Sequence, residues 1–130
     1  MLSDEMNCLA LYAIFTMAVI LAQVIAAQMQ VGLAMLIGPR DNMPPLTGTA
    51  GRLFRAQANS IAALALMAPA VLMLQKMGYS TGSTVAAAQI FLIARVVYVP
   101  AYVLGLPWVR TLAWVVGFYC TGWLYFLAAF

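Results

Sequence analysis

Four long stretches of apolar residues dominate this sequence, and short polar breaks separate them. The stretches are residues 8–29, 49–77, 83–104 and 108–130. Each can cross the roughly 30 Å hydrocarbon core of a bilayer as a helix, which takes about 20 residues. The breaks are rich in glycine and proline, the residue types that most often end helices. The pattern predicts an all-α, integral membrane four-helix bundle that forms a single domain over residues 1–130.

Composition agrees with the pattern and narrows the classes of partner. Hydrophobic residues make up 66% of the chain and charged residues 7%, so a water-soluble globule could not cover its apolar surface. The net charge is +3, but the six basic residues are scattered and form no basic stripe, which argues against a nucleic-acid partner. The bilayer is therefore the first partner that we expect.

The basic residues are distributed unequally between the two ends of the predicted bundle. Arg40, Arg52, Arg55 and Arg110 flank the first and third breaks, whereas Asp4, Glu5 and Lys76 lie at the opposite end. Cytoplasmic loops of membrane proteins carry an excess of lysine and arginine. This distribution places those two breaks in the cytoplasm and both chain termini outside.

Two polar stripes with the same spacing, i, i+3 and i+7, interrupt the second and third apolar stretches. They consist of Arg52, Arg55 and Asn59 and of Arg95, Tyr98 and Tyr102. On a helix this spacing places three side chains on one face. In the predicted topology both stripes converge on the cytoplasmic end of the bundle, together with Arg110 and Thr111 from the start of the last stretch.

Arg95 is the residue that most needs a polar partner inside the membrane, because it lies about nine residues, or roughly 14 Å, from the end of its helix. The chain has only three acidic residues, and all are near helix ends or in loops, so no carboxylate is available to pair with Arg95 inside the membrane. Two interpretations remain open. Either the arginines bind an anionic ligand, or carbonyls and tyrosines satisfy them structurally.

Other site chemistries lack their residues. The chain has two cysteines, Cys8 and Cys120, far apart in the sequence, and no histidine, so zinc, histidine-ligated haem and C-x-x-C redox sites have no ligand set and we expect no metal. A small proton-coupled exporter would also have four spans, but it needs a carboxylate within the membrane, and the predicted spans contain none.

Short motifs with a fixed order and spacing run through most of the chain. They are Gly38-Pro39-Arg40-Asp41, Pro44-Pro45-Leu46, Arg52, Arg55-Ala56, Asn59, Ala94-Arg95-Val96, Tyr98, Tyr102, Gly105, Pro107 and Arg110-Thr111. In this arrangement the sequence resembles the MAPEG family, the membrane-associated proteins in eicosanoid and glutathione metabolism, in its bacterial form. The resemblance implies a homotrimer in the bacterial inner membrane, with glutathione bound between subunits near the cytoplasmic face.

The resemblance also implies residue roles and an activity. Glutathione would be the co-substrate, held by Arg52, Arg55, Asn59, Arg95, Tyr98 and Tyr102. Arg110 would act on the thiol, because a guanidinium beside the sulfur stabilises thiolate, and Thr111 would donate a further bond. The expected function is a detoxifying glutathione transferase or peroxidase that acts on small lipophilic electrophiles.

The chain departs from the family pattern at several positions, and the departure at Ala62 bears most directly on activity. Ala62 stands where the family usually has a glutamate that binds the amino group of glutathione. This departure leaves two alternatives to the transferase. One is a catalytically silent membrane scaffold or accessory subunit that associates with another membrane protein, and the other is a site for another anionic thiol or a lipid.

Overall fold

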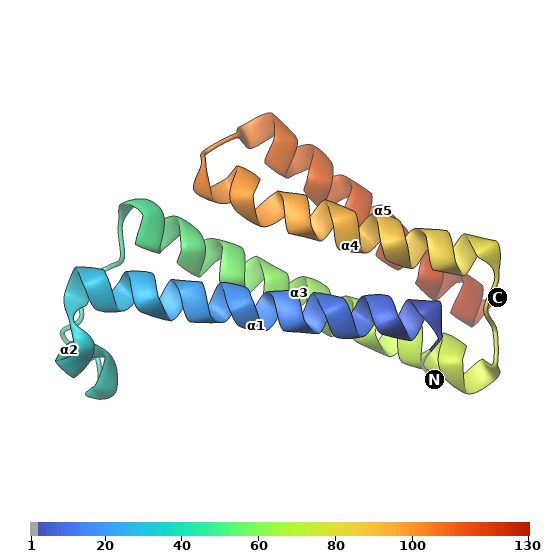
Figure 1. The fold of residues 1–130 in the computed structure, drawn as a ribbon, viewed down its shortest axis with the longest axis horizontal. Coiled ribbons are helices and arrows are strands. Elements are labelled where there is room, and N and C mark those ends of the chain that lie inside the picture. Colours follow the sequence, from blue (N-terminus) through green and yellow to red (C-terminus); the bar gives the residue numbers. More distant parts are fainter. Residues whose placement is uncertain (1–2) are drawn as a thin grey trace.

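The computed structural model describes residues 3–130, which form four long helices, one short helix and the connections between them (Figure 1). The helices are α1 (Asp4–Val31), α2 (Leu33–Ile37), α3 (Gly48–Met77), α4 (Gly82–Val103) and α5 (Pro107–Ala129). The four long helices are each long and apolar enough to cross a membrane. The predicted class, an all-α membrane bundle with four spans, is therefore confirmed.

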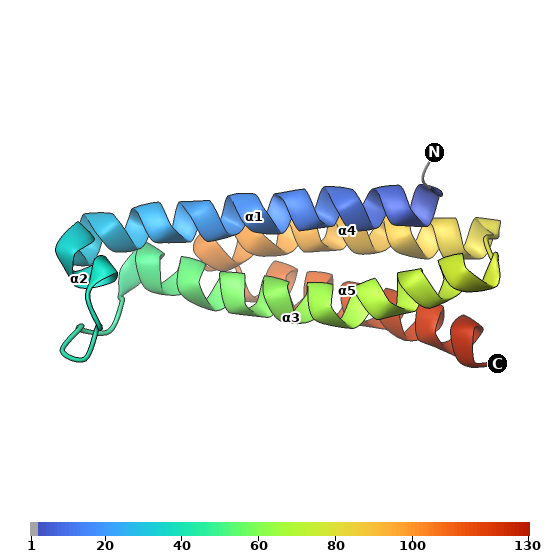
Figure 2. The same ribbon diagram turned by 90° about the horizontal axis from the view of Figure 1, so that it is seen from below.

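The long helices run up and down and form two layers. In Figure 1, α1 begins and α5 ends beside the α3–α4 turn, and the α1–α3 connection and the α4–α5 turn lie at the other end. Figure 2 shows α1 and α4 in one layer and α3 and α5 in the other. Helices α3 and α4 also contact each other across the layers. The positively charged helix starts, those of α3 and α5, consequently lie at the same end of the bundle.

Local sequence explains where the central helices begin and end. Thr81 and Thr84 form a capping box at the start of α4, in which each side-chain hydroxyl accepts the other residue's backbone N–H. Helix α3 ends at Gly78, whose φ of 68° is left-handed and suits glycine. The N–H of Tyr79 then bonds back to the carbonyl of Leu74 over 3.0 Å, which completes the helix end.

Two buried clusters hold the layers together. The larger occupies the half of the bundle near the chain termini and contains Tyr12, Met67, Leu74, Phe91 and Leu124 among its fully buried side chains. The smaller lies nearer the arginine-rich end and contains Val19, Ala56, Tyr98, Val99 and Ala113. Large apolar side chains such as Met17 and Leu112 are 70% and 63% exposed, as befits a surface that faces lipid.

Glu5 is buried at the end of the bundle that is opposite the arginines. Its carboxylate Oε1 accepts hydrogen bonds from the hydroxyls of Ser80, over 2.8 Å, and Thr84. Glu5 is only 2% exposed, and its Oε2 has no hydrogen-bond partner within the described chain. This carboxylate therefore ties the start of α1 to the α3–α4 turn.

Candidate functional site

Tyr102, near the end of α4, lies between two arginines from different helices. Its hydroxyl accepts a hydrogen bond from Nε of Arg55 on α3 over 3.0 Å. Its ring faces Arg110 on α5, with 4.6 Å between the guanidinium carbon and the ring centre. A guanidinium at this distance from an aromatic face is attracted to the ring's quadrupole. Tyr102 thus fixes a cation from α5 near the arginine-rich end of the bundle.

Arg95 lies deeper in the bundle and is 2% exposed. Its Nη2 donates to Oδ1 of Asn59 over 2.7 Å, and its Nε donates to the hydroxyl of Tyr12 over 3.3 Å. The guanidinium carbon lies 4.2 Å from the centre of the Tyr98 ring. Within the chain, Arg95 therefore has the polar network of side chains that was one of the two interpretations left open for it.

A polar hollow of about 330 Å³ lies toward the arginine-rich end from Arg95, and two of the residues that contact Arg95, Asn59 and Tyr98, line it. It is lined by Asn59, Tyr98, Tyr102, Arg110, Thr111 and Trp114. Five of these six are residues that the sequence placed in the site, and they come from α3, α4 and α5. The hollow combines one guanidinium with hydroxyl and amide groups, which is the chemistry of a site that takes an anion.

A second cleft, of about 230 Å³, adjoins the first and shares Asn59 and Trp114 with it. It runs deeper between α3 and α5 with α4 behind it. Arg95 lines it, and the other lining residues are largely apolar: Ala62, Ala63, Leu66, Phe91, Gly117, Phe118 and Thr121. Gly117 gives Arg95 its space, because a Cβ added there would lie 3.2 Å from Arg95 Cδ. The polar hollow therefore lies beside a largely apolar cleft.

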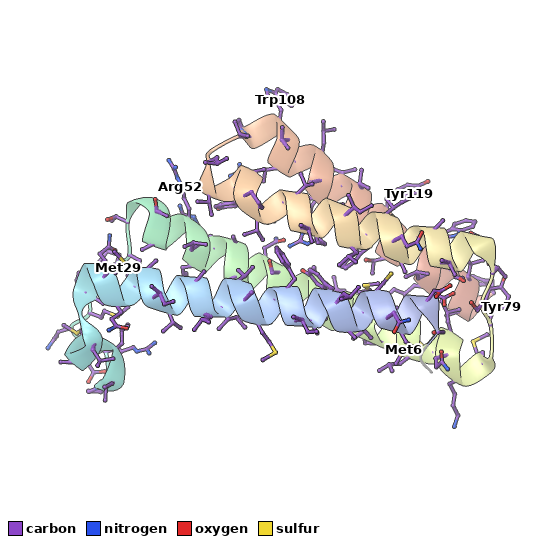
Figure 3. All side chains as sticks on the ribbon, in the orientation of Figure 1. Met6, Met29, Arg52, Tyr79, Trp108 and Tyr119 are labelled. Atoms are coloured by element: carbon purple, nitrogen blue, oxygen red, sulfur yellow. The ribbon has the colours of Figure 1, made fainter. Side chains whose placement is uncertain are left out.

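Arg52 and Arg55 lie outside the polar hollow. Arg52 donates from Nη1 to the carbonyl of Val103 over 3.1 Å and reaches from the start of α3 to the end of α4 (Figure 3). Arg55 lines a separate hollow with Leu46, Phe54 and other residues near the α1–α3 connection. Through these bonds to Val103 and Tyr102, the two arginines tie α3 to α4.

Thr111 lines the polar hollow, but its hydroxyl already has an acceptor. Its Oγ1 donates to the carbonyl of Pro107 within α5 over 2.8 Å. A hydroxyl has one proton to donate and keeps lone pairs that accept. Thr111 is thus arranged to accept a hydrogen bond from a ligand, and the expected donation to a thiol would first require its bond to Pro107 to break.

Sequence reasoning missed Tyr12, which is fully buried on α1 and connects two other helices. Its hydroxyl donates to the carbonyl of Ser60 over 2.9 Å and accepts from Arg95. A signal for it existed in the sequence. Tyr12 follows Cys8 and precedes Thr16 at intervals of four residues, so all three share one helix face, which is buried.

The fold and the site together define a small integral membrane protein with a cationic, tyrosine-rich site at one end of its bundle. A family model described as the MAPEG family matches residues 6–130, nearly the whole chain, and the protein belongs to that family. No curated protein and no solved structure matches the chain. The family resemblance seen in the sequence motifs is therefore confirmed.

Proposed function

We propose that this protein is a membrane transferase or peroxidase. Its thiol co-substrate is glutathione or a related anionic thiol, which reacts with lipophilic electrophiles. The observation that carries the proposal is the position of Arg110, whose guanidinium lies over the Tyr102 ring and lines the polar hollow. A fixed cation beside hydroxyl and amide groups is suited to hold a thiolate.

Arg110 would act electrostatically, because an arginine guanidinium in a protein has no site to accept a proton. By stabilising the anion it lets the thiol release its proton to water at a lower pH. The thiolate then forms a sulfur–carbon bond with the electrophile, and the leaving group departs with the electron pair of the broken bond. With a hydroperoxide as electrophile, two thiols would be oxidised to a disulfide while the hydroperoxide is reduced to an alcohol and water.

Arg95 and Asn59 would position the ligand. Because Asn59 accepts from Arg95 through Oδ1, its amide nitrogen remains to donate into the polar hollow that Asn59 lines. Arg95 is itself held by Tyr12 and by the Tyr98 ring. The two residues would thereby present a donor whose direction is fixed before the ligand arrives.

The family and the charge distribution suggest the setting of the site. We propose a homotrimer whose arginine-rich end faces the cytoplasm of a bacterial inner membrane, with both termini on the other side. In that setting Arg52 and Arg55, which lie outside the hollow of their own subunit, would serve the carboxylates of a thiol bound between subunits. The electrophile would come from the bilayer through the apolar cleft between α3 and α5.

The test is calorimetric titration of the detergent-solubilised protein with glutathione, combined with chlorodinitrobenzene conjugation by wild type and Arg110→Ala. Saturable binding, with turnover that falls at least about tenfold in the variant, is the expected result. Ala62 favours one second candidate, the catalytically silent scaffold, because no carboxylate stands there. Absence of binding and turnover, together with a membrane protein that copurifies stoichiometrically, would favour that candidate instead.

A further inference from the structure

We infer that the site selects anionic thiols without a free ammonium group, such as an N-acylated glutathione, over glutathione itself. The inference rests on the proposed thiol chemistry and names the substrate class of the same site. Two independent observations carry it: the distribution of charge around the two hollows, and the apolar character of the deeper one.

The first observation is that the site has cations and no carboxylate. Arg110 lines the polar hollow and Arg95 lines the cleft, and among the described residues no acidic side chain lines either of them. Glu5 is engaged with Ser80 and Thr84 at the opposite end of the bundle. An ammonium group that entered would meet positive charges and would lose its water without gaining a charged acceptor.

The acidic residues other than Glu5 do not change this balance. Asp4 lies in the first turn of α1, at the end opposite the arginines, and Asp41 lies in the connection between α2 and α3. Neither is among the residues that line the two hollows. The two hollows therefore offer a ligand's carboxylates several donors and offer an ammonium group no ionic partner.

The second observation is the cleft below Asn59. Ala62, Leu66 and Phe118 line it, and its volume of about 230 Å³ can hold a small acyl group. An uncharged acyl group there would bury apolar surface, which is favourable, whereas a charged group would be desolvated against methyl and phenyl groups. The ligand that matches both hollows has an anionic, thiol-bearing part beside Arg110 and a neutral part beside Ala62.

Ala62 is the position at which this selectivity can be reversed. Its side chain is exposed on α3 and lines the open cleft, so a larger side chain there meets little steric resistance. Ala62→Glu would place a carboxylate in the cleft. Ala62→Gln has nearly the same shape without the charge and is the matched control.

The experiment compares glutathione with N-acetylglutathione, which differ only in the acylated amino group. Both are titrated calorimetrically into the full-length wild-type protein in detergent and into the two variants, and thermal unfolding checks that each variant is folded. We expect wild type to bind the acetylated thiol at least about tenfold more tightly. Ala62→Glu should invert the order of the two affinities, and Ala62→Gln should keep the wild-type order.

The outcomes separate this inference from the function on which it rests. If wild type binds glutathione as tightly as its acetylated form, or more tightly, the selectivity is refuted while the transferase function stands. The same follows if folded Ala62→Glu and Ala62→Gln change the two affinities equally. If neither thiol binds, the proposed function fails, and the inference fails with it. If Ala62→Glu does not fold, the affinities of wild type for the two thiols still decide whether the selectivity exists.

Discussion

The guanidinium carbon of Arg110 lies 4.6 Å from the ring centre of Tyr102. The same tyrosine accepts a hydrogen bond from Arg55 through its hydroxyl, over 3.0 Å. The ring thus holds the cation on α5, and the hydroxyl holds the cation on α3, whose guanidinium carbon lies farther from the ring centre, at 5.9 Å. Because the two interactions use different parts of the side chain, substitution can separate them.

Tyr102→Phe should weaken thiol binding and leave the chemical step nearly intact. The variant keeps the ring beneath Arg110 and removes the acceptor of Arg55, whose loss we expect to raise KM by about fivefold, or roughly 1 kcal/mol, at constant kcat. Tyr102→Ala removes both the ring and the hydroxyl and should lower kcat as well. Steady-state kinetics measures KM and kcat separately for each variant. Tyr119→Phe, at a side chain that is 76% exposed, is the control and should change neither constant. A lower kcat in Tyr102→Phe would show that the hydroxyl takes part in the chemistry.

Arg95→Met should destabilise the fold much more than Arg110→Met. Arg95 is 2% exposed, and its removal takes a donor from Asn59 and Tyr12, so we expect a loss of about 2–4 kcal/mol. Arg110 is partly exposed and lines an open hollow, so its loss should be smaller. Thermal unfolding in detergent compares the two variants. Equal losses would mean that the buried network around Arg95 contributes little to stability.

Gly117→Ala should displace Arg95, whereas Gly122→Ala should not. A Cβ at Gly117 would lie 3.2 Å from Arg95 Cδ, tighter than ordinary van der Waals contact. A Cβ at Gly122, on the same helix, would meet nothing within 4 Å. We expect Gly117→Ala to cost about 1–2 kcal/mol of unfolding free energy and to weaken thiol binding, and Gly122→Ala to be neutral or slightly stabilising. Equal effects of the two substitutions would contradict the proposed packing of Arg95.

Glu5→Ala should lower stability without affecting the site. The substitution removes the acceptor of the Ser80 and Thr84 hydroxyls, at a cost of about 1–2 kcal/mol, but Glu5 lies at the end of the bundle away from the arginines. Asp4→Ala, its exposed neighbour, is the control and should have a smaller effect. The measurements are thermal unfolding and thiol affinity. A change in affinity would show that the two ends of the bundle are coupled.

The sequence predicted the helical class and the grouping of polar residues because both depend on local periodicity. Apolar runs of membrane length predict helices directly, and the i, i+3, i+7 spacing placed Tyr98 and Tyr102 on one helix face. In the structure both line the polar hollow with Arg110 and Asn59. These inferences needed only helix geometry and the order of the loops.

The partners of individual arginines could not be predicted in the same way. Arg52 and Asn59 share a helix face by spacing, and both contact α4, but Arg52 bonds to Val103 at its end while Asn59 bonds to Arg95 farther inside. Which residue of α4 each side chain meets depends on how the two helices are aligned along their lengths, and that alignment is set by tertiary packing. Tyr12 was missed for the same reason, since its partner Arg95 is 83 residues away in the sequence.

The ionisation of a bound thiol, followed across pH by the ultraviolet absorbance of its thiolate, tests the role of Arg110 most directly. A guanidinium beside the sulfur favours the anion, so the midpoint of ionisation should lie below that of the free thiol in the same detergent. In Arg110→Ala we predict that the midpoint rises toward the free value by about one pH unit or more, while thiol binding persists. The same midpoint in wild type and variant, at saturating thiol, would contradict the account.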